Sequence, residues 1–235
     1  GFIGNRMLLG YSKQANMLLL EGALPSQIDN AIEAFGLNMG PFRMMDLIGL
    51  DLGWRARKLA GVDSPLTNKI ADTLCENERF GQKNAKGFYN YSEGSRAPNP
   101  APENEEIYFK ISEENGFTRR EISDEEIVDR CILALVNEGA KILEEGVAQR
   151  ASDMDIVYIN GYGFPVWRGG PMFYANSLGL GKVLEKLKDF QQIDSDFWKP
   201  ADLIEKLAKD KSKFGEAPDI NERKEKMKFP DIVGY

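Results

Sequence analysis

The sequence contains no histidine among its 235 residues. Histidine is the side chain that most often serves as a general base near neutral pH, and it is the commonest transition-metal ligand. Its absence excludes a Ser-His or Cys-His nucleophilic site made by this chain alone. No group of other side chains has the spacing of a metal site, so no metal ligands are expected. Acid–base chemistry here would need a carboxylate, a lysine or a group on another polypeptide segment.

Cysteines, long apolar runs and excess positive charge are also scarce. Cys75 and Cys131 are the only cysteines, and each lies in a periodic apolar stretch, which favours buried free thiols in a reducing compartment over a disulfide. No apolar run is long enough to span a bilayer. The net charge of −7 argues against nucleic acid or an anionic membrane surface as the main partner.

The sequence contains one pattern twice. Shifting residues 3–22 by 124 positions aligns their apolar, charged and glycine residues with those of 127–146. Self-similarity at a fixed offset is typical of a duplicated structural unit. The matched pairs are Ile3 with Ile127, Arg6 with Arg130, Leu19 with Leu143, Glu21 with Glu145, and Gly22 with Gly146.

The match continues downstream at offsets that increase to 126 and then 130. Small increases of this kind are expected when loops of different length separate helices of fixed length. The later pairs are Ser26 with Ser152, Asp29 with Asp155, Gly40-Pro41 with Gly170-Pro171, and Gly49-Leu50 with Gly179-Leu180.

Both copies are predicted to be helical, which makes the expected fold all-α. Apolar residues recur at helical spacing over 3–19 and 127–143, and a glycine follows each stretch as a C-cap. Ser123 with Glu126 forms a capping-box pattern, and Ser26 and Ser152 are predicted N-caps of the next helices. Further helices are predicted over 50–60, 65–77, 181–190 and 200–208, and only 87–91 is predicted to be extended.

The two copies are predicted to be separate domains. Residues 92–104 are rich in proline, glycine, serine and glutamate and lack periodicity, which is typical of a linker. We therefore predict a first helical unit over 1–91, a linker over 92–118, and a second unit over 119–235 that ends in a charged tail from Glu216. The two homologous repeats are expected to pack against each other as an intramolecular pseudo-dimer.

Several motifs, in this order along the chain, resemble the C-terminal helical domain of the L-3-hydroxyacyl-CoA dehydrogenases. A further segment resembles the second helical repeat of the multifunctional fatty-acid oxidation enzymes. The dehydrogenase motifs are GFIGNR (1–6), EGALPSQID (21–29), MGPF (39–42), DLIGLD (46–51), RFGQK (79–83) and KGFYNY (86–91), and the repeat segment is INGYGFPVWRGGPMFYA (159–175).

The resemblance implies NAD-dependent oxidation of an L-3-hydroxyacyl-CoA to the 3-ketoacyl-CoA in fatty-acid β-oxidation. In that family an N-terminal Rossmann domain binds NAD and carries the catalytic histidine and its glutamate partner. This chain has no strand followed by Gly-x-Gly-x-x-Gly, so no cofactor-binding residue is expected in it. It is expected to be the substrate-side part of the enzyme, inactive alone, with acyl-CoA and the Rossmann domain as partners. The implied compartment is the peroxisome, with the mitochondrion or bacterial cytoplasm as alternatives.

Asn5 is the position to which the resemblance gives an active-site role, that of orienting the substrate's 3-oxygen. The alternative is that Asn5 caps its own helix, as asparagine often does. The second copy has Asp129 at this place, and an ionised carboxylate cannot donate to a carbonyl, so the second copy is expected to be noncatalytic. Arg6 and Arg130 occur in both copies and are therefore expected to hold neighbouring helices.

Other interpretations remain at this stage. Lys83 and Lys86 lie among glycines, but they lack P-loop spacing, so a tight turn is the better prediction than a phosphate site. One alternative function is a noncatalytic helical module for assembly of a multienzyme complex. Another is a related dehydrogenase that acts on a different 3-hydroxy acid.

Overall fold

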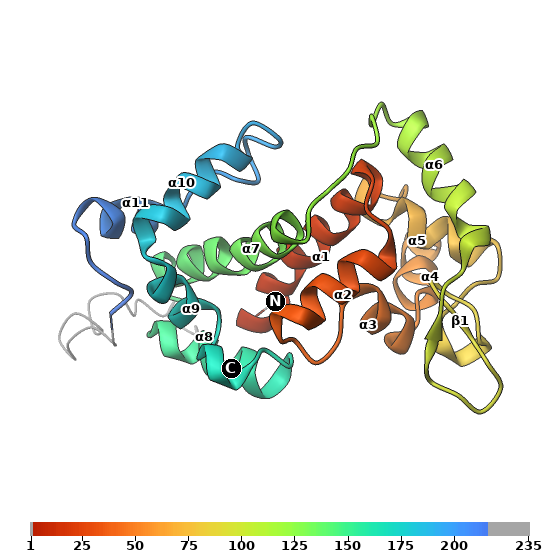
Figure 1. The fold of residues 1–235 in the computed structure, drawn as a ribbon, viewed down its shortest axis with the longest axis horizontal. Coiled ribbons are helices and arrows are strands. Elements are labelled where there is room, and N and C mark those ends of the chain that lie inside the picture. The colour runs from red at the N-terminus through yellow and green to blue at the C-terminus, as the bar shows by residue number, and fades with distance from the viewer. Residues whose placement is uncertain (1, 216–235) are drawn as a thin grey trace, which may run out of the picture. The chain divides into compact units, whose positions relative to one another are not determined.

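The computed structural model describes residues 2–215, and within this range the fold is all-α, as predicted. Figure 1 shows the helices in chain order. The tail predicted from Glu216 lies outside the described residues. The helices are α1 (Ile3–Glu21), α2 (Pro25–Phe35), α3 (Pro41–Ile48), α4 (Asp51–Ala60), α5 (Leu66–Glu76), α6 (Glu105–Glu114), α7 (Asp124–Glu144), α8 (Ala151–Gly161), α9 (Pro171–Leu178), α10 (Leu180–Phe190) and α11 (Asp202–Lys209).

The chain forms two compact units, one of which combines two separate segments of the sequence. One unit combines residues 1–11 with 130–235, and we call it the 130–235 unit; the other is the 12–129 unit. The divisions fall inside α1 and α7, because each of these long helices contributes residues to both units. The domain limits predicted at 91 and 119 describe the sequence repeat, and they stay a prediction.

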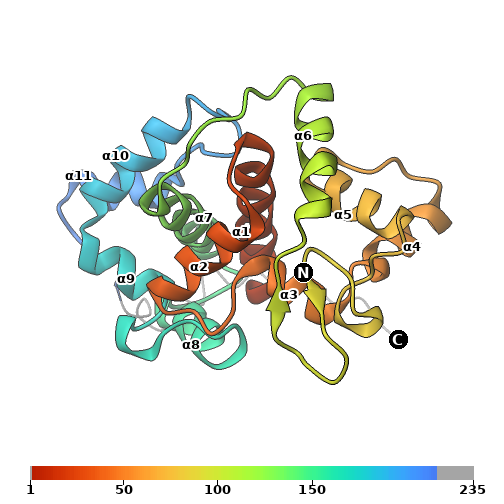
Figure 2. The same ribbon diagram turned by 45° about the vertical axis from the view of Figure 1, so that its right-hand side comes forward.

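The 12–129 unit contains a helix within the segment predicted as a linker. A short antiparallel ribbon pairs β1 (Asn90–Tyr91) with β2 (Pro98–Asn99), and the 3₁₀ turn η2 (Pro102–Asn104) leads into α6. Helix α6 packs on α5 and buries Tyr108 and Ile111, and Figure 2 shows the two helices side by side. Helix α6 was not predicted from the sequence, because its apolar positions follow directly on a proline-rich stretch.

The 130–235 unit is built from successive helices that each pack on the next. Helix α8 contacts α9, α9 contacts α10, and α10 contacts α11. Trp198, in the loop between α10 and α11, is fully buried and packs against Phe190 with ring centroids 4.8 Å apart. This loop therefore closes the apolar core of the unit.

The helices repeat in order and in length. Helices α2 and α8 each have 11 residues, α3 and α9 each have 8, and α4 and α10 have 10 and 11. The loop before α9 is longer than the loop before α3, and it contains the 3₁₀ turn η3 (Val166–Arg168). This insertion accounts for the increase of the sequence offset from 126 to 130.

The two copies also share one buried carboxylate contact. Asp29 accepts hydrogen bonds from the backbone N–H groups of Phe42 and Arg43, at 2.9 and 3.0 Å, in the first turn of α3. Asp155 accepts the equivalent bonds in the first turn of α9, from Met172 at 2.7 Å and from the next residue at 3.2 Å. Each aspartate thereby satisfies donors that the start of a helix leaves without partners.

The glycine before each of these short helices is required by the same contact. A Cβ on Gly40 would lie 2.4 Å from Asp29, and a Cβ on Gly170 would lie 2.4 Å from Asp155. Such distances are far below van der Waals contact, so the carboxylate can approach the helix only beside glycine. In each copy, the repeated aspartate and the repeated Gly-Pro pair are thus parts of the same packing contact.

The predicted N-caps were right for one helix and wrong for two. The hydroxyl of Ser123 accepts from the N–H of Glu126 at 3.2 Å, as predicted for the start of α7. Ser26 and Ser152 instead lie inside α2 and α8, which begin one residue earlier. Helix α2 begins with a proline, whose lack of an N–H suits that position, and Arg150 with its N3 aspartate caps α8.

The buried aspartates predict a measurable pH dependence. Burial raises the pKa of Asp29 to about 6, although the Tyr89 hydroxyl and the two backbone donors oppose the shift. A carboxyl whose pKa is higher in the folded than in the unfolded chain stabilises the fold at low pH, and that stability is lost as the pH rises from about 4 to about 6. Asp29→Asn should therefore make the slope of the unfolding free energy in this window more positive, by about 1.4 kcal/mol per pH unit. Chemical denaturation at several pH values measures the slope, and an unchanged slope contradicts the raised pKa.

Candidate functional site

The candidate site is centred on Asn5, which is exposed in the first turn of α1. The helix begins at Ile3, so Asn5 lies inside it and is not its N-cap. Its Oδ1 accepts a hydrogen bond from the hydroxyl of Tyr162 at 3.0 Å. Within residues 2–215, no acceptor takes a hydrogen bond from its Nδ2. The amide therefore has a fixed acceptor end and an available donor end.

A pair of tyrosines from α8 and its C-cap lies against this turn of α1. The rings of Tyr158 and Tyr162 are stacked, with centroids 4.7 Å apart and planes 19° from parallel. The hydroxyl of Tyr158 donates to the carbonyl oxygen of Gly4 at 3.1 Å. Burial raises the pKa of Tyr158 above its usual range, which keeps this hydroxyl protonated as a donor. All these residues belong to the 130–235 unit.

Gly4 makes this close approach possible. A Cβ at this position would lie 2.4 Å from the Tyr162 hydroxyl oxygen and 2.5 Å from its ring. Any larger residue would push the ring away from α1 and break the contact with Asn5. The glycine of the GFIGNR motif is thus a packing requirement of the tyrosine pair.

Arg6 has the structural role that the sequence predicted. Its guanidinium donates to Glu138 on α7 at 2.8 Å and to Glu145, the residue that follows α7, at 3.0 Å, and these carboxylates raise its pKa above the usual range. The side chain of Arg6 therefore ties the first turns of α1 to α7. Arg130 is fully buried, in keeping with a structural role.

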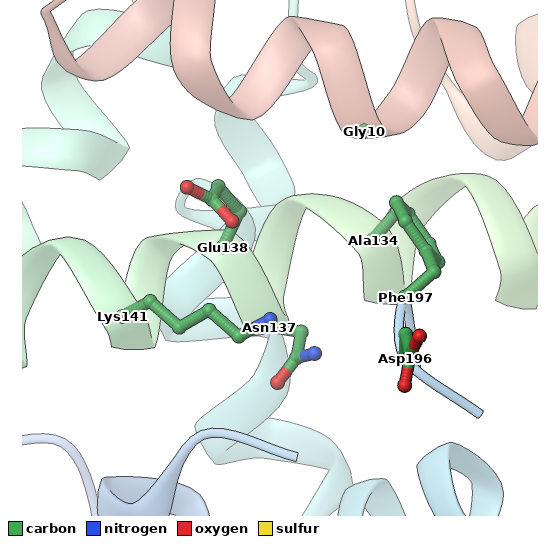
Figure 3. A pocket seen from close by; sticks show the side chains of 7 residues that line it. All are labelled: Gly10, Ala134, Asn137, Glu138, Lys141, Asp196 and Phe197. Carbon is green, nitrogen blue, oxygen red and sulfur yellow. The ribbon is translucent and has the colours of Figure 1, made fainter. Parts of the chain in front are cut away.

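A small cavity of about 100 Å³ lies next to this ion-pair network (Figure 3). Gly10 on α1 faces Ala134 on α7, and the ring of Phe197 lies beside Ala134. The volume is sufficient for a few water molecules and much too small for an acyl-CoA. The remaining lining residues are Asn137, Glu138, Lys141 and Asp196.

The other residues weighed from the sequence do not form a site. Lys83 pairs with Asp51 beside the 3₁₀ turn η1 (Gln82–Asn84), which agrees with a tight turn and not with phosphate binding. Cys75 and Cys131 are buried and are not joined by a disulfide, as expected. Over the described part of the chain there is no group of three or more potential metal-ligating side chains, and no helix is long and apolar enough to cross a membrane.

Sequence reasoning did not find Tyr158 and Tyr162. Tyr162 belongs to the INGYGFP segment noted above, but nothing in the segment says that it contacts a residue more than 150 positions earlier. A usable signal was the comparison of the two copies. At the offset of 126 these tyrosines correspond to Ile32 and Gly36, so the second copy departs from the first at both places.

Comparison with known families agrees with the resemblance found from the motifs. Residues 1–91 match the family described as 3-hydroxyacyl-CoA dehydrogenase, C-terminal domain. This part of the chain belongs to that family. The prediction made from the GFIGNR and later motifs is thereby confirmed.

Relatives with similar sequences cover both copies. The peroxisomal bifunctional enzyme of Danio rerio is 43% identical over 224 residues, and that of Homo sapiens is 42% identical over 225; each alignment covers 88% of this chain. The fatty acid oxidation complex subunit alpha of a Shewanella species is 31% identical over 220 residues, or 91% of this chain. The chain spans only 30 to 31% of the length of these relatives.

Two solved structures have a similar fold. The dehydrogenase part of multifunctional enzyme 1 from C. elegans matches with a TM-score of 0.70 and 30% identity, over 87% of this chain and 47% of that one. The 3-hydroxybutyryl-CoA dehydrogenase from Escherichia coli matches with a TM-score of 0.66 over 90% of this chain and 60% of that one. At 19% identity, the second match supports the fold alone.

The structural role of Arg6 is testable. Arg6→Met leaves the carboxylates of Glu138 and Glu145 without their shared cation, so it should lower the free energy of unfolding by about 1 kcal/mol. Lys188→Met is a matched control in the same unit, because its ion pair with Glu205 is 4.0 Å long and half exposed. The control should cost less than about 0.5 kcal/mol. Equal losses for the two variants in chemical denaturation would contradict the structural role of Arg6.

Proposed function

We propose that this chain is the helical, substrate-side part of an NAD-dependent L-3-hydroxyacyl-CoA dehydrogenase of fatty-acid β-oxidation. The reaction oxidises an L-3-hydroxyacyl-CoA to the 3-ketoacyl-CoA. The family match over residues 1–91 supports this assignment, as do the relatives named for peroxisomal bifunctional enzymes and for fatty acid oxidation. The names of these relatives also support a peroxisomal location, with the bacterial cytoplasm as the alternative.

The observation that carries the proposal is the state of the Asn5 amide. Its oxygen is held by Tyr162, while the residue is exposed and its Nδ2 has no acceptor among the described residues. Phe2 lies just before α1, three residues from Asn5, and Leu9 lies four residues from Asn5 within α1; they are 86% and 72% exposed. A donor flanked by exposed apolar side chains suits a substrate that joins a polar 3-oxygen to an apolar acyl chain.

In this mechanism Asn5 binds and orients the 3-oxygen of the substrate. Nδ2 donates a hydrogen bond to the hydroxyl oxygen, which develops negative charge as its proton leaves for a base. A donor that is already aimed at this oxygen stabilises the charge at no cost of reorientation. Asn5 itself cannot accept the proton at neutral pH, so the base must lie on another part of the protein.

The residues that the structure describes do not fit an NAD site. A dinucleotide needs a strand, a glycine-rich turn and a helix N-terminus, and the described strands are two residues long and antiparallel to each other. NAD would supply the hydride acceptor that the oxidation requires. We therefore assign its binding to a separate Rossmann domain that works together with Asn5.

The proposal predicts a specific kinetic effect of Asn5→Ala in the full-length protein. Removal of one donor to a developing oxyanion should lower kcat by about 10² to 10³. NAD affinity should stay near that of the unchanged protein, because Asn5 is not part of the nucleotide site. Steady-state formation of NADH from a 3-hydroxyacyl-CoA measures kcat, and cofactor titration measures affinity.

Asp129→Ala is the matched control, since Asp129 stands at the position of Asn5 in the second copy. It should leave turnover almost unchanged. Unchanged turnover of the Asn5 variant would overturn the assignment of Asn5 and favour a noncatalytic assembly role for the chain.

We also propose that the two copies form an intramolecular pseudo-dimer, in which the second copy replaces the partner subunit of single-repeat relatives. The matched lengths of α2 with α8 and of α3 with α9 support a duplicated unit. The isolated chain should then sediment as a monomer, because its apolar helix faces are covered internally. A tight homodimer that forms through residues 1–91 would contradict this arrangement.

A further inference from the structure

The hydrogen bond between Tyr162 and Asn5 joins the two copies at the candidate site. Asn5 comes from the first copy and Tyr162 from the second, and both lie within the 130–235 unit. We propose that Tyr162 is a positioning residue for the dehydrogenase reaction, which it serves by fixing the orientation of the Asn5 amide. The second copy then supplies part of the working site. This inference rests on the proposed function.

The two ends of an asparagine amide have opposite hydrogen-bonding chemistry, since the oxygen accepts and the nitrogen donates. The oxygen and nitrogen of an asparagine side chain exchange places when the amide turns by half a rotation, and an exposed amide does this easily. Only one orientation presents a donor to the substrate. The other presents an oxygen, which repels the negative charge that develops on the 3-oxygen. A partner that binds the amide oxygen therefore selects the productive state.

The Tyr162 hydroxyl has the chemistry and the position for this selection. It donates to Oδ1 of Asn5 at 3.0 Å, an ordinary distance for such a bond. With the oxygen occupied, Nδ2 is the end of the amide that remains available. The hydroxyl acts through Asn5 and needs no contact with the substrate.

Tyr162 is held in place by a second tyrosine and by the backbone of α1. Its ring stacks on Tyr158, and the buried hydroxyl of Tyr158 is bonded to the carbonyl oxygen of Gly4. On its other side the Tyr162 ring lies against Gly4, and any side chain at position 4 would clash with the ring. The tyrosine is thus confined by a stacked ring and by the backbone of the helix that carries Asn5. A confined donor loses little entropy when it holds the amide.

The two copies differ at both residues of this contact. The first copy has Gly4 and Asn5 where the second has Val128 and Asp129. The second copy has Tyr162 at the C-cap of α8, where the first has Gly36 at the C-cap of α2. A glycine has no hydroxyl, and an aspartate has no amide to orient. The hydrogen bond therefore pairs Asn5 of the first copy with Tyr162 of the second, and the corresponding residues Asp129 and Gly36 cannot form it. The contact between a buried aspartate and a glycine, by contrast, occurs in both copies.

A purely structural role for Tyr162 predicts a different result from a positioning role. If the hydroxyl only stabilised the fold, its removal would lower the unfolding temperature and leave kcat unchanged in the folded enzyme. If it positions Asn5, its removal lowers kcat and leaves the fold intact. Tyr162→Phe separates the two, because phenylalanine keeps the stacked ring and loses only the hydroxyl.

The test is a double-mutant cycle in the full-length protein, with Asn5→Ala, Tyr162→Phe and the double variant. Tyr162→Phe alone should lower kcat by about tenfold, which corresponds to the loss of one hydrogen bond in the transition state. NAD affinity and thermal stability should not change. In the Asn5→Ala background the same substitution should change kcat by less than about twofold, because no amide remains to be oriented.

Two further variants complete the design. Gly4→Ala keeps both tyrosines but displaces the Tyr162 ring, so it should lower kcat at least as much as Tyr162→Phe. Tyr174→Phe, on α9 of the same unit, is the matched control and should leave kcat unchanged. A loss of kcat for Tyr162→Phe that is equally large with and without Asn5 would overturn the inference.

The outcomes also distinguish this inference from the proposed function. If Asn5→Ala lowers kcat and Tyr162→Phe does not, the inference fails and the proposed function stands. If Asn5→Ala itself leaves kcat unchanged, the proposed role of Asn5 fails first, and the positioning role fails with it.

Discussion

The fold depends on a buried carboxylate that binds the start of a short helix, once in each copy. Asp29 fixes α3 on α2, and Asp155 fixes α9 on α8, through backbone donors in the first turn of the short helix. Helices of 8 residues are marginal on their own, so their position must come from such a contact. Because the carboxylate needs a glycine beside it, the Asp and Gly-Pro landmarks of the sequence are tied together by packing.

This shared scaffold leaves the copies free to differ elsewhere. The first turn of α1 carries Asn5, and the end of α8 carries Tyr162, and neither residue has an equivalent in the other copy. The duplication gives two similar scaffolds, and the functional difference that we propose lies at positions where their side chains differ. The second copy therefore has a more active part in our proposal than its aspartate at 129 suggested.

Much of the fold was predictable from the sequence because it depends on local signals. Helical periodicity and glycine C-caps gave the positions of α1 and α7 to within a few residues, and the repeat gave the order of the others. Helix α6 was missed because proline and glycine nearby dominate a short window. The N-caps assigned to Ser26 and Ser152 were wrong by two residues, since Leu24 before a proline is the N-cap of one helix and Arg150, paired with an aspartate, is the N-cap of the other.

The candidate site was only half predictable, and the reason is geometric. Asn5 belongs to the GFIGNR motif, which is recognisable in the sequence, so its proposed role follows from local residues. Tyr162 acts across a contact between residues far apart in the chain, and no local pattern encodes such a contact. The sequence indicates this contact only indirectly: Gly4, next to Asn5, has no side chain, and the tyrosine ring lies where a Cβ would be. A glycine inside a helix, where it costs about 1 kcal/mol relative to alanine, is a signal that another group comes close.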